Sequence, residues 1–187
     1  MSLSTVKHLV NAGADISVKD KAGHDALWHA MTTSNASIVD YLIKEHADLQ
    51  SKDKSGLTLL HQAPLLNNIE VASLLIKRGL AVNAITKDGN TPLMMAASRG
   101  HNQTVQKLLT EGAEVNGRNN IGNSPLILSV MADSSASVKL LLAAGARVDD
   151  RNNKREQALD IAQQGKNQSI INMLVKHKDE NKLFDIF

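Results

Sequence analysis

The chain has 187 residues, of which 42% are hydrophobic and only 2% aromatic, so its core must be built from aliphatic side chains. A net charge of +2 is too small to indicate nucleic-acid binding by itself, and the absence of cysteine excludes disulfides and thiolate zinc sites. No apolar run approaches the roughly 18 residues of a membrane span, and residues 1–13 lack the apolar stretch of a secretory signal. We therefore expect a cytoplasmic chain without a membrane partner, while secretion as an effector stays open.

Glycine recurs at intervals of 33 residues in two separate series. The first series is Gly23, Gly56, Gly89 and Gly122, with Arg155 at the next step. The second series is Gly13, His46, Gly79, Gly112 and Gly145, with Lys178 at the next step. Both series keep one period without insertion or deletion, which indicates a stack of similar units rather than a globule with one irregular core.

In chain order, residues 5–10 come first and have the apolar spacing of a helix that closes a unit, with Val6, Leu9 and Val10 on one face. The first helix that should pair with it is missing, so its outward side is expected to be uncovered. Two explanations stay open. The chain is a fragment trimmed at a repeat boundary, or the half unit itself caps the stack.

Five first helices follow, each beginning beside a capping residue. In the clearest case Thr91 is a good N-cap. Pro92 suits the first helical position, because an N–H group at that position would have no partner within the helix and proline has none to lose. Pro64 should distort the helix that contains it, since it removes a backbone donor. The five starts are Asp25-Ala26-Leu27, Thr58-Leu59-Leu60, Thr91-Pro92-Leu93, Ser124-Pro125-Leu126 and Gln157-Ala158-Leu159.

Each first helix is followed by a second helix with three apolar residues on one face, and a glycine of the second series ends most of these helices. Neither helix of a unit could bury its apolar face alone, so each unit must pack on its neighbours. The predicted second-helix cores are Val39/Leu42/Ile43, Ala72/Leu75/Ile76, Val105/Leu108/Leu109, Val138/Leu141/Leu142 and Ile171/Leu174/Val175.

The motifs of one unit are Gly89-Asn90-Thr91-Pro92-Leu93, Gly100-His101 and Gly112-Ala113-Glu114-Val115-Asn116. This pattern resembles the ankyrin repeat over residues 4–178. The resemblance implies an all-α ankyrin-repeat solenoid, a curved stack of antiparallel helix pairs with projecting hairpin-like loops. It divides a single domain, 1–187, into a half repeat (4–19), four repeats (20–52, 53–85, 86–118 and 119–151), a C-terminal capping repeat (152–178) and a tail (179–187).

The last unit departs from the pattern as terminal caps do. Arg155 and Lys178 replace the two glycines, and Asp160, Gln163 and Gln164 make the first helix polar. After it, residues 176–182 form a solvated charged run. The final segment, 183–187, has two alternatives: it folds back over the last helix pair, or it docks on a partner or another copy.

No catalytic constellation is found, and neither a metal nor a cofactor is expected. His61 and His101 occupy structural positions of the family, which implies hydrogen bonds between helices and loops. His24 and His29 lack a third metal ligand at helical spacing. The acidic loop at residues 149–153 is not a calcium loop, because Lys154 falls where an oxygen ligand is needed.

Partners of ankyrin stacks usually bind the concave side, which loop tips and first helices form. Seven of ten residues in two loop columns that the resemblance places there are cationic, a basic stripe on a nearly neutral chain. The alternative is that these loop tips are simply solvated by lysine. One column is Lys19, Lys52, Ile85, Arg118 and Arg151, and the other is Lys21, Lys54, Lys87, Asn120 and Asn153.

Exposed aliphatic side chains would give this groove an apolar centre. Leu65 and Leu66 follow Pro64 at positions that usually face the concave side, although a kink at Pro64 could turn both into the core. Leu57, Met131 and Ile85 join them, and the remaining members of the predicted site are Asn90, Arg99 and Asn123.

These observations favour a non-enzymatic module that binds another protein, through an acidic or an apolar-plus-acidic segment, and acts as a monomer. One alternative is a fragment whose repeats target a separate catalytic domain. A ligand-binding protein or enzyme is disfavoured by the short loops, and a nucleic-acid binder by the few aromatics and the small net charge.

Overall fold

The computed structural model describes residues 2–33 and 35–184, with side chains at all of these except 65 and 180–184. Within this part of the chain the regular elements are eleven helices, and no strand forms. Two isolated β-bridges, Lys52–Thr58 and Arg151–Gln157, close the bases of two loops. The helices are α1 (Leu3–Asn11), α2 (Ala26–Met31), α3 (Ala36–Lys44), α4 (Leu59–Leu65), α5 (Ile69–Lys77), α6 (Pro92–Ala97), α7 (Asn102–Thr110), α8 (Pro125–Met131), α9 (Ser135–Ala143), α10 (Ala158–Gly165) and α11 (Gln168–Phe184).

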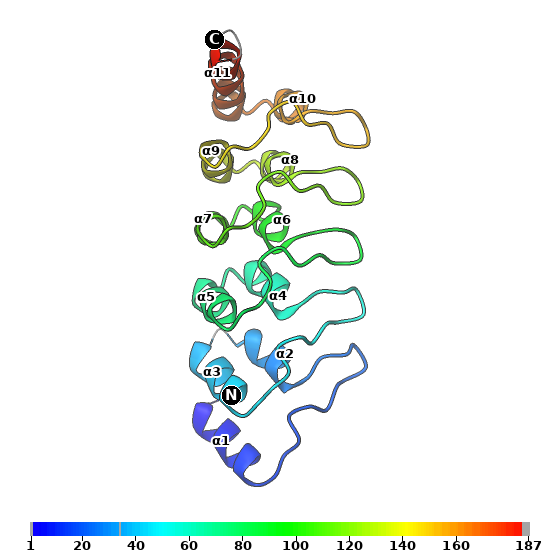
Figure 1. Ribbon diagram of the computed structural model, residues 1–187, viewed down its shortest axis with the longest axis vertical. Coiled ribbons are helices and arrows are strands. Elements are labelled where there is room, and N and C mark those ends of the chain that lie inside the picture. Colours follow the sequence, from blue (N-terminus) through cyan, green and yellow to red (C-terminus); the bar gives the residue numbers. More distant parts are fainter. Residues whose placement is uncertain (1, 34, 185–187) are drawn as a thin grey trace.

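The helices form two parallel columns, and the loops project from one side of the stack (Figure 1). The even-numbered helices from α2 to α10 lie next to the loops, and the odd-numbered helices from α3 to α11 form the outer column. Successive pairs contact one another along both columns. The predicted all-α repeat solenoid is therefore confirmed.

Side-chain caps explain where the first helices begin. The Asp25 carboxylate accepts the N–H of Trp28 at 2.9 Å, and the Thr91 hydroxyl accepts that of Met94 at 3.2 Å. Ser124 caps α8 in the same way. Each of these bonds satisfies a backbone donor that the first turn of a helix leaves free. These three helix starts agree with the sequence prediction.

Pro64 does not break α4, because it lies in the last turn of that helix. The backbone N–H of Leu66 still reaches the carbonyl of Gln62 at 3.2 Å. The carbonyl of Pro64 accepts a bond from the His101 ring at 2.7 Å, which ties α4 to the next repeat. The expected distortion is therefore limited to the single donor that proline lacks.

In the middle of the stack the predicted second-helix cores are buried, except that Ile76 and Leu109 are only partly buried, and two predictions at the ends are wrong. Leu9 is 52% exposed and Val175 is 41% exposed. Both lie on terminal helices, where the described chain offers no further helix pair to cover the outer side. In α11 Leu174 is buried as predicted, together with Ile170, four positions earlier on the same face.

A further buried column in the second helices was not predicted. The residue before each predicted core triplet is fully buried, at 0% exposure. Two of its members are polar, and each is satisfied: Thr104 donates to Asn67 Oδ1 at 3.0 Å, and Ser137 donates to Asn102 Oδ1 at 2.6 Å. Hydrogen bonding removes the cost of burying these hydroxyls. The column consists of Ile38, Val71, Thr104, Ser137 and Ile170.

The second glycine series marks a left-handed turn after each second helix. Its glycines have φ values between 83° and 87°, and His46 adopts φ 65° at the same step. The series ends at Lys178 because α11 continues through that position, where the Lys178 ammonium pairs with Asp149 at 2.8 Å. Arg155, which stands where the first series would place its next glycine, also adopts the left-handed conformation, with φ 66°.

His46→Gly is expected to raise the free energy of unfolding by about 1 kcal/mol. An L-residue in the left-handed region costs about 1–2 kcal/mol, and the greater flexibility of unfolded glycine offsets part of that gain. Urea denaturation followed by circular dichroism measures the change. Glu45→Gly is the matched control, because Glu45 has φ −83° and should lose stability on the same substitution. A destabilised His46→Gly would contradict the prediction.

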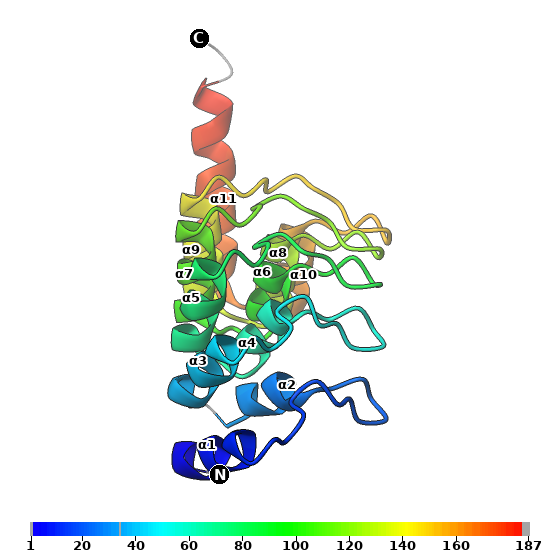
Figure 2. The same ribbon diagram turned by 60° about the horizontal axis from the view of Figure 1, so that its bottom comes forward.

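The last helix is longer than predicted. The charged run expected after it is helical, and α11 extends over 17 residues to Phe184 (Figure 2). Figure 2 shows this helix continuing past the ends of its neighbours in the outer column. The described start of the 183–187 segment thus continues the helix, and residues 185–187 lie outside the described residues.

Candidate protein-interaction surface

Five loops and the first helices beside them form one side of the stack, which we call the loop surface (Figures 1 and 2). Each loop turns around one short polar side chain. Asp20 Oδ1 accepts the N–H groups of Ala22 at 2.8 Å and His24 at 2.9 Å. The loops comprise residues 19–24, 52–57, 85–90, 118–123 and 151–156. The same pair of hydrogen bonds, from two backbone N–H groups to one side-chain oxygen, recurs at Asp53, Asn119 and Asn152.

Backbone hydrogen bonds join neighbouring loops into one array. Lys87 N donates to the carbonyl of Ser55 at 3.0 Å, and Asn120 N donates to that of Asp88 at 3.0 Å. The third bond runs from Asn153 N to Ile121 O at 3.1 Å. Among the described residues no such bond joins the first loop to the second. The four later loops therefore hold their side chains at fixed positions relative to one another.

The predicted cationic columns are exposed on these loops. Lys19, Lys21, Lys52, Lys54, Lys87, Arg118 and Arg151 are all exposed, and none of the ion pairs seen among the described residues involves them.

Several of these cations also contact loop carbonyls. The Lys87 ammonium donates to Lys54 O at 2.6 Å, and the Arg118 guanidinium donates to Gly122 O at 3.1 Å and to the carbonyl of Arg151. Arg151 donates in turn to Arg155 O at 2.6 Å. A carbonyl group orients a cation without neutralising it, so the positive charges persist on the surface.

The predicted apolar residues divide into exposed and covered ones. Ile85 is 62% exposed, Met131 is 58% exposed and Leu66 is 38% exposed, while Leu57 is half-buried. The alternative in which Pro64 turns Leu66 into the core is therefore not the one observed. The side chain of Leu65 lies outside the described residues.

One exposed apolar residue of the loop surface was missed. Ile121 is 62% exposed at a loop tip, where the corresponding residues of the two preceding loops are Ser55 and Asp88. An isoleucine at a turn position normally filled by small or polar residues was the available signal.

Three of the predicted asparagines, Asn90, Asn120 and Asn123, are used within the stack. Asn90 is half-buried and its side-chain oxygen accepts a bond from Asn119 at 2.9 Å, while the Asn120 amide donates to Lys87 O at 2.9 Å. Asn123 is only 3% exposed, and its amide donates to the Met131 sulfur at 3.8 Å. Asn123 is thus placed beneath the surface rather than on it, and Arg99 is exposed just after α6.

The two structural histidines hold loops to helices, as expected. His61 Nδ1 contacts Thr58, and its Nε2 contacts the carbonyl of Asn90 in the next repeat at 2.9 Å. Burial lowers the pKa of His61, because a charged imidazole would lose its hydration there. The His61 ring therefore stays neutral at physiological pH and acts as a hydrogen-bonding bridge.

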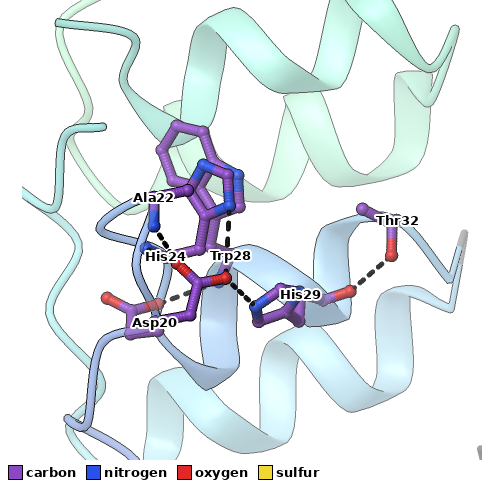
Figure 3. Close-up of polar contacts among 7 residues, drawn as sticks. Asp20, Ala22, His24, Trp28, His29 and Thr32 are labelled. Carbon is purple, nitrogen blue, oxygen red and sulfur yellow. Dashed lines mark hydrogen bonds and ion pairs between the residues drawn. The ribbon is translucent and has the colours of Figure 1, made fainter. Parts of the chain in front are cut away.

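Two other histidines meet a carboxylate in the first loop (Figure 3). His29 Nε2 lies 3.0 Å from Asp20 Oδ2, and His24 Nδ1 lies 3.7 Å from the same oxygen. The backbone N–H of His24 is the main cause of a lowered Asp20 pKa, and the Ala22 N–H and the His29 ring act in the same direction. The expectation that His24 and His29 lack a third partner is wrong, because Asp20, four positions before His24, lies in the loop before α2 and reaches both rings.

Within the described residues, no helix combines the length and the apolar character needed to cross a membrane. The fold and the loop surface together define a class of protein, the solenoid built from stacked helix pairs with projecting loops.

A family model for ankyrin repeats, built of three copies, matches residues 2–86 and 93–185. The chain therefore belongs to the ankyrin repeat family, as its motifs indicated. No curated protein sequence matches the chain. Ankyrin repeats are generally protein–protein interaction modules and are typically non-enzymatic.

Proposed function

We propose that this chain is a non-enzymatic interaction module that binds a protein segment on its loop surface, and that this segment carries carboxylates around an apolar centre. The observation that carries the proposal is the row of seven exposed cations on loops that are mostly hydrogen-bonded to one another. A fixed array of like charges attracts a segment of opposite charge, raises its association rate and disfavours basic partners.

The apolar part of the proposal rests on Ile85, Ile121 and Met131, each more than half exposed on this side of the stack. Large apolar side chains that are exposed beside a polar rim are typical anchor points for a partner. Apolar contacts would provide most of the affinity, while the surrounding lysines would select the partner. We expect the module to bind as a monomer.

The test begins with peptides selected from a random displayed library by the wild-type chain. Selected peptides should be enriched in Asp and Glu next to apolar residues. A synthetic copy should then bind the loop triple Lys52→Glu/Lys54→Glu/Lys87→Glu about tenfold or more weakly, because each reversal turns an attraction into a repulsion. Fluorescence anisotropy measures both dissociation constants.

The control triple is Lys7→Glu/Lys77→Glu/Lys139→Glu, which changes the net charge equally on α1, α5 and α9. All three control lysines are exposed and lie away from the loops. The affinity of the control triple for the peptide should stay within about twofold of that of the wild type. The melting temperatures of both triples should match that of the wild type. Equal loss in both triples would show that only net charge matters, and no loss in the loop triple would overturn the proposed face.

A further inference from the structure

We propose that Asp20, His24 and His29 form a binding site for one divalent transition-metal ion, with Zn²⁺ the best fit. Each residue offers one ligand atom, and the three atoms all lie within 4.8 Å of one another. Neither the repeat fold nor the proposed loop-surface function requires the two imidazole rings beside Asp20. The inference therefore stands apart from the proposed function.

The distances suit a common metal centre. In a tetrahedral zinc site with bonds of about 2.0–2.1 Å, the ligand atoms lie about 3.3 Å apart. Asp20 Oδ2 lies 3.0 Å from His29 Nε2 and 3.7 Å from His24 Nδ1, which brackets that spacing. Small rotations of exposed side chains would bring all three atoms to bonding distance from one ion.

Two of the three ligands, Asp20 and His24, are also held in place by their surroundings. Asp20 Oδ1 is occupied by the backbone N–H groups of Ala22 and His24, so Oδ2 is left facing the two rings (Figure 3). The His24 ring stacks on Trp28, with centroids 4.6 Å apart and planes inclined by 5°. Trp28 is itself 4% exposed and is therefore fixed by the core. Ligands oriented before binding lose little freedom when the metal enters.

Comparison with the other repeats shows that the architecture does not need these rings. The residues 33 and 66 positions after His24 are Leu57 and Asn90, and those after His29 are Gln62 and Met95. In the second loop, the free oxygen of the equivalent aspartate, Asp53 Oδ2, accepts a bond from the Ser55 hydroxyl at 2.9 Å. Only in the first loop does the second carboxylate oxygen face two imidazoles among the described residues.

The donor set selects the kind of ion. Two imidazole nitrogens and one carboxylate suit Zn²⁺ and its transition-metal neighbours, whereas Mg²⁺ and Ca²⁺ prefer oxygen ligands throughout. The side chains of Asp20 and His29 are 41% and 56% exposed. A metal held by these three ligands would thus keep a fourth coordination position open to water or to a side chain from outside the chain.

Isothermal titration of the full chain with zinc chloride tests the site. One ion should bind per chain, and excess Mg²⁺ should not compete. Asp20→Asn removes the charge but keeps an oxygen for the two backbone N–H groups, and His29→Ala removes an exposed ring. Each should weaken zinc binding by about tenfold or more. His8→Ala and His46→Ala are the controls, because they remove exposed histidines outside the cluster, and should leave binding unchanged.

Melting curves in the presence of a chelator should be the same for the wild type and the variants. This control shows that a variant that no longer binds zinc is still folded. A second measurement needs no substitution. In NMR spectra of the wild-type chain, zinc should shift the ring nitrogen resonances of His24 and His29 and leave those of His101 unchanged. If the wild type binds no zinc, or if Asp20→Asn and His29→Ala bind it as tightly as the wild type, the cluster is only an aspartate–histidine contact and the proposal is wrong.

Discussion

Leu108→Ala is expected to lower the free energy of unfolding by about 2–5 kcal/mol, the range for truncating a large buried aliphatic side chain. Leu108 is 0% exposed in α7, and this helix packs between α5 and α9 in the outer column. The surrounding helices belong to rigidly stacked repeats, so the cavity can collapse only in part. Because each repeat depends on its neighbours, the loss should weaken the whole stack rather than one unit.

Urea denaturation monitored by circular dichroism measures this loss, and Leu109→Ala is the matched control. The two leucines are adjacent on α7, but Leu109 is only partly buried. The control should therefore cost clearly less stability. If Leu109→Ala cost as much as Leu108→Ala, helix propensity rather than core packing would explain the result, and the predicted cavity would be refuted.

The repeat period and the helix starts could be predicted because local chemistry alone determines them. Thr91 caps α6 by a bond to a residue three positions away, and Gly112 ends a helix through its own φ of 83°. Such signals need no knowledge of distant residues. The ends of the stack were harder, since burial there depends on what lies beyond the helix, as the exposed Leu9 and Val175 show.

Contacts between repeats explain the remaining differences. Thr104 and Ser137 are polar residues in core positions, and their partners, Asn67 and Asn102, lie 37 and 35 positions earlier in the chain. A pattern of apolar residues cannot reveal a core position that is filled by a satisfied hydroxyl.

In the candidate site, too, some features could be predicted from the sequence and others depend on contacts in the folded chain. The columns of Lys and Arg could be placed on the loops from the 33-residue period alone. The burial of Asn123 and the bond from the Lys87 ammonium to the Lys54 carbonyl could not be predicted in this way, because both depend on side-chain directions. The Asp20 cluster combines Asp20 and His24 of the first loop with His29 of α2, and only the folded loop brings the carboxylate to both rings.

Gly122→Ala is expected to lower the free energy of unfolding by about 2–5 kcal/mol, for two separate reasons. Gly122 has φ 79°, and an L-residue in that region costs about 1–2 kcal/mol. A Cβ atom there would also lie 2.8 Å from the backbone nitrogen of Asn153 in the next loop, and such overpacking typically costs about 1–3 kcal/mol more. The backbone cannot move away without breaking the bond from Asn153 to Ile121 O.

Gly145→Ala separates the two contributions. Gly145 has φ 87°, but a Cβ atom added to it would have no other atom within 4 Å. It should therefore show only the backbone cost, about 1–2 kcal/mol. The difference between the two variants, measured by urea denaturation, reports how firmly neighbouring loops are joined. Equal losses would mean that the loops can separate freely, and the fixed array of cations on which the proposed binding surface depends would then lose its physical basis.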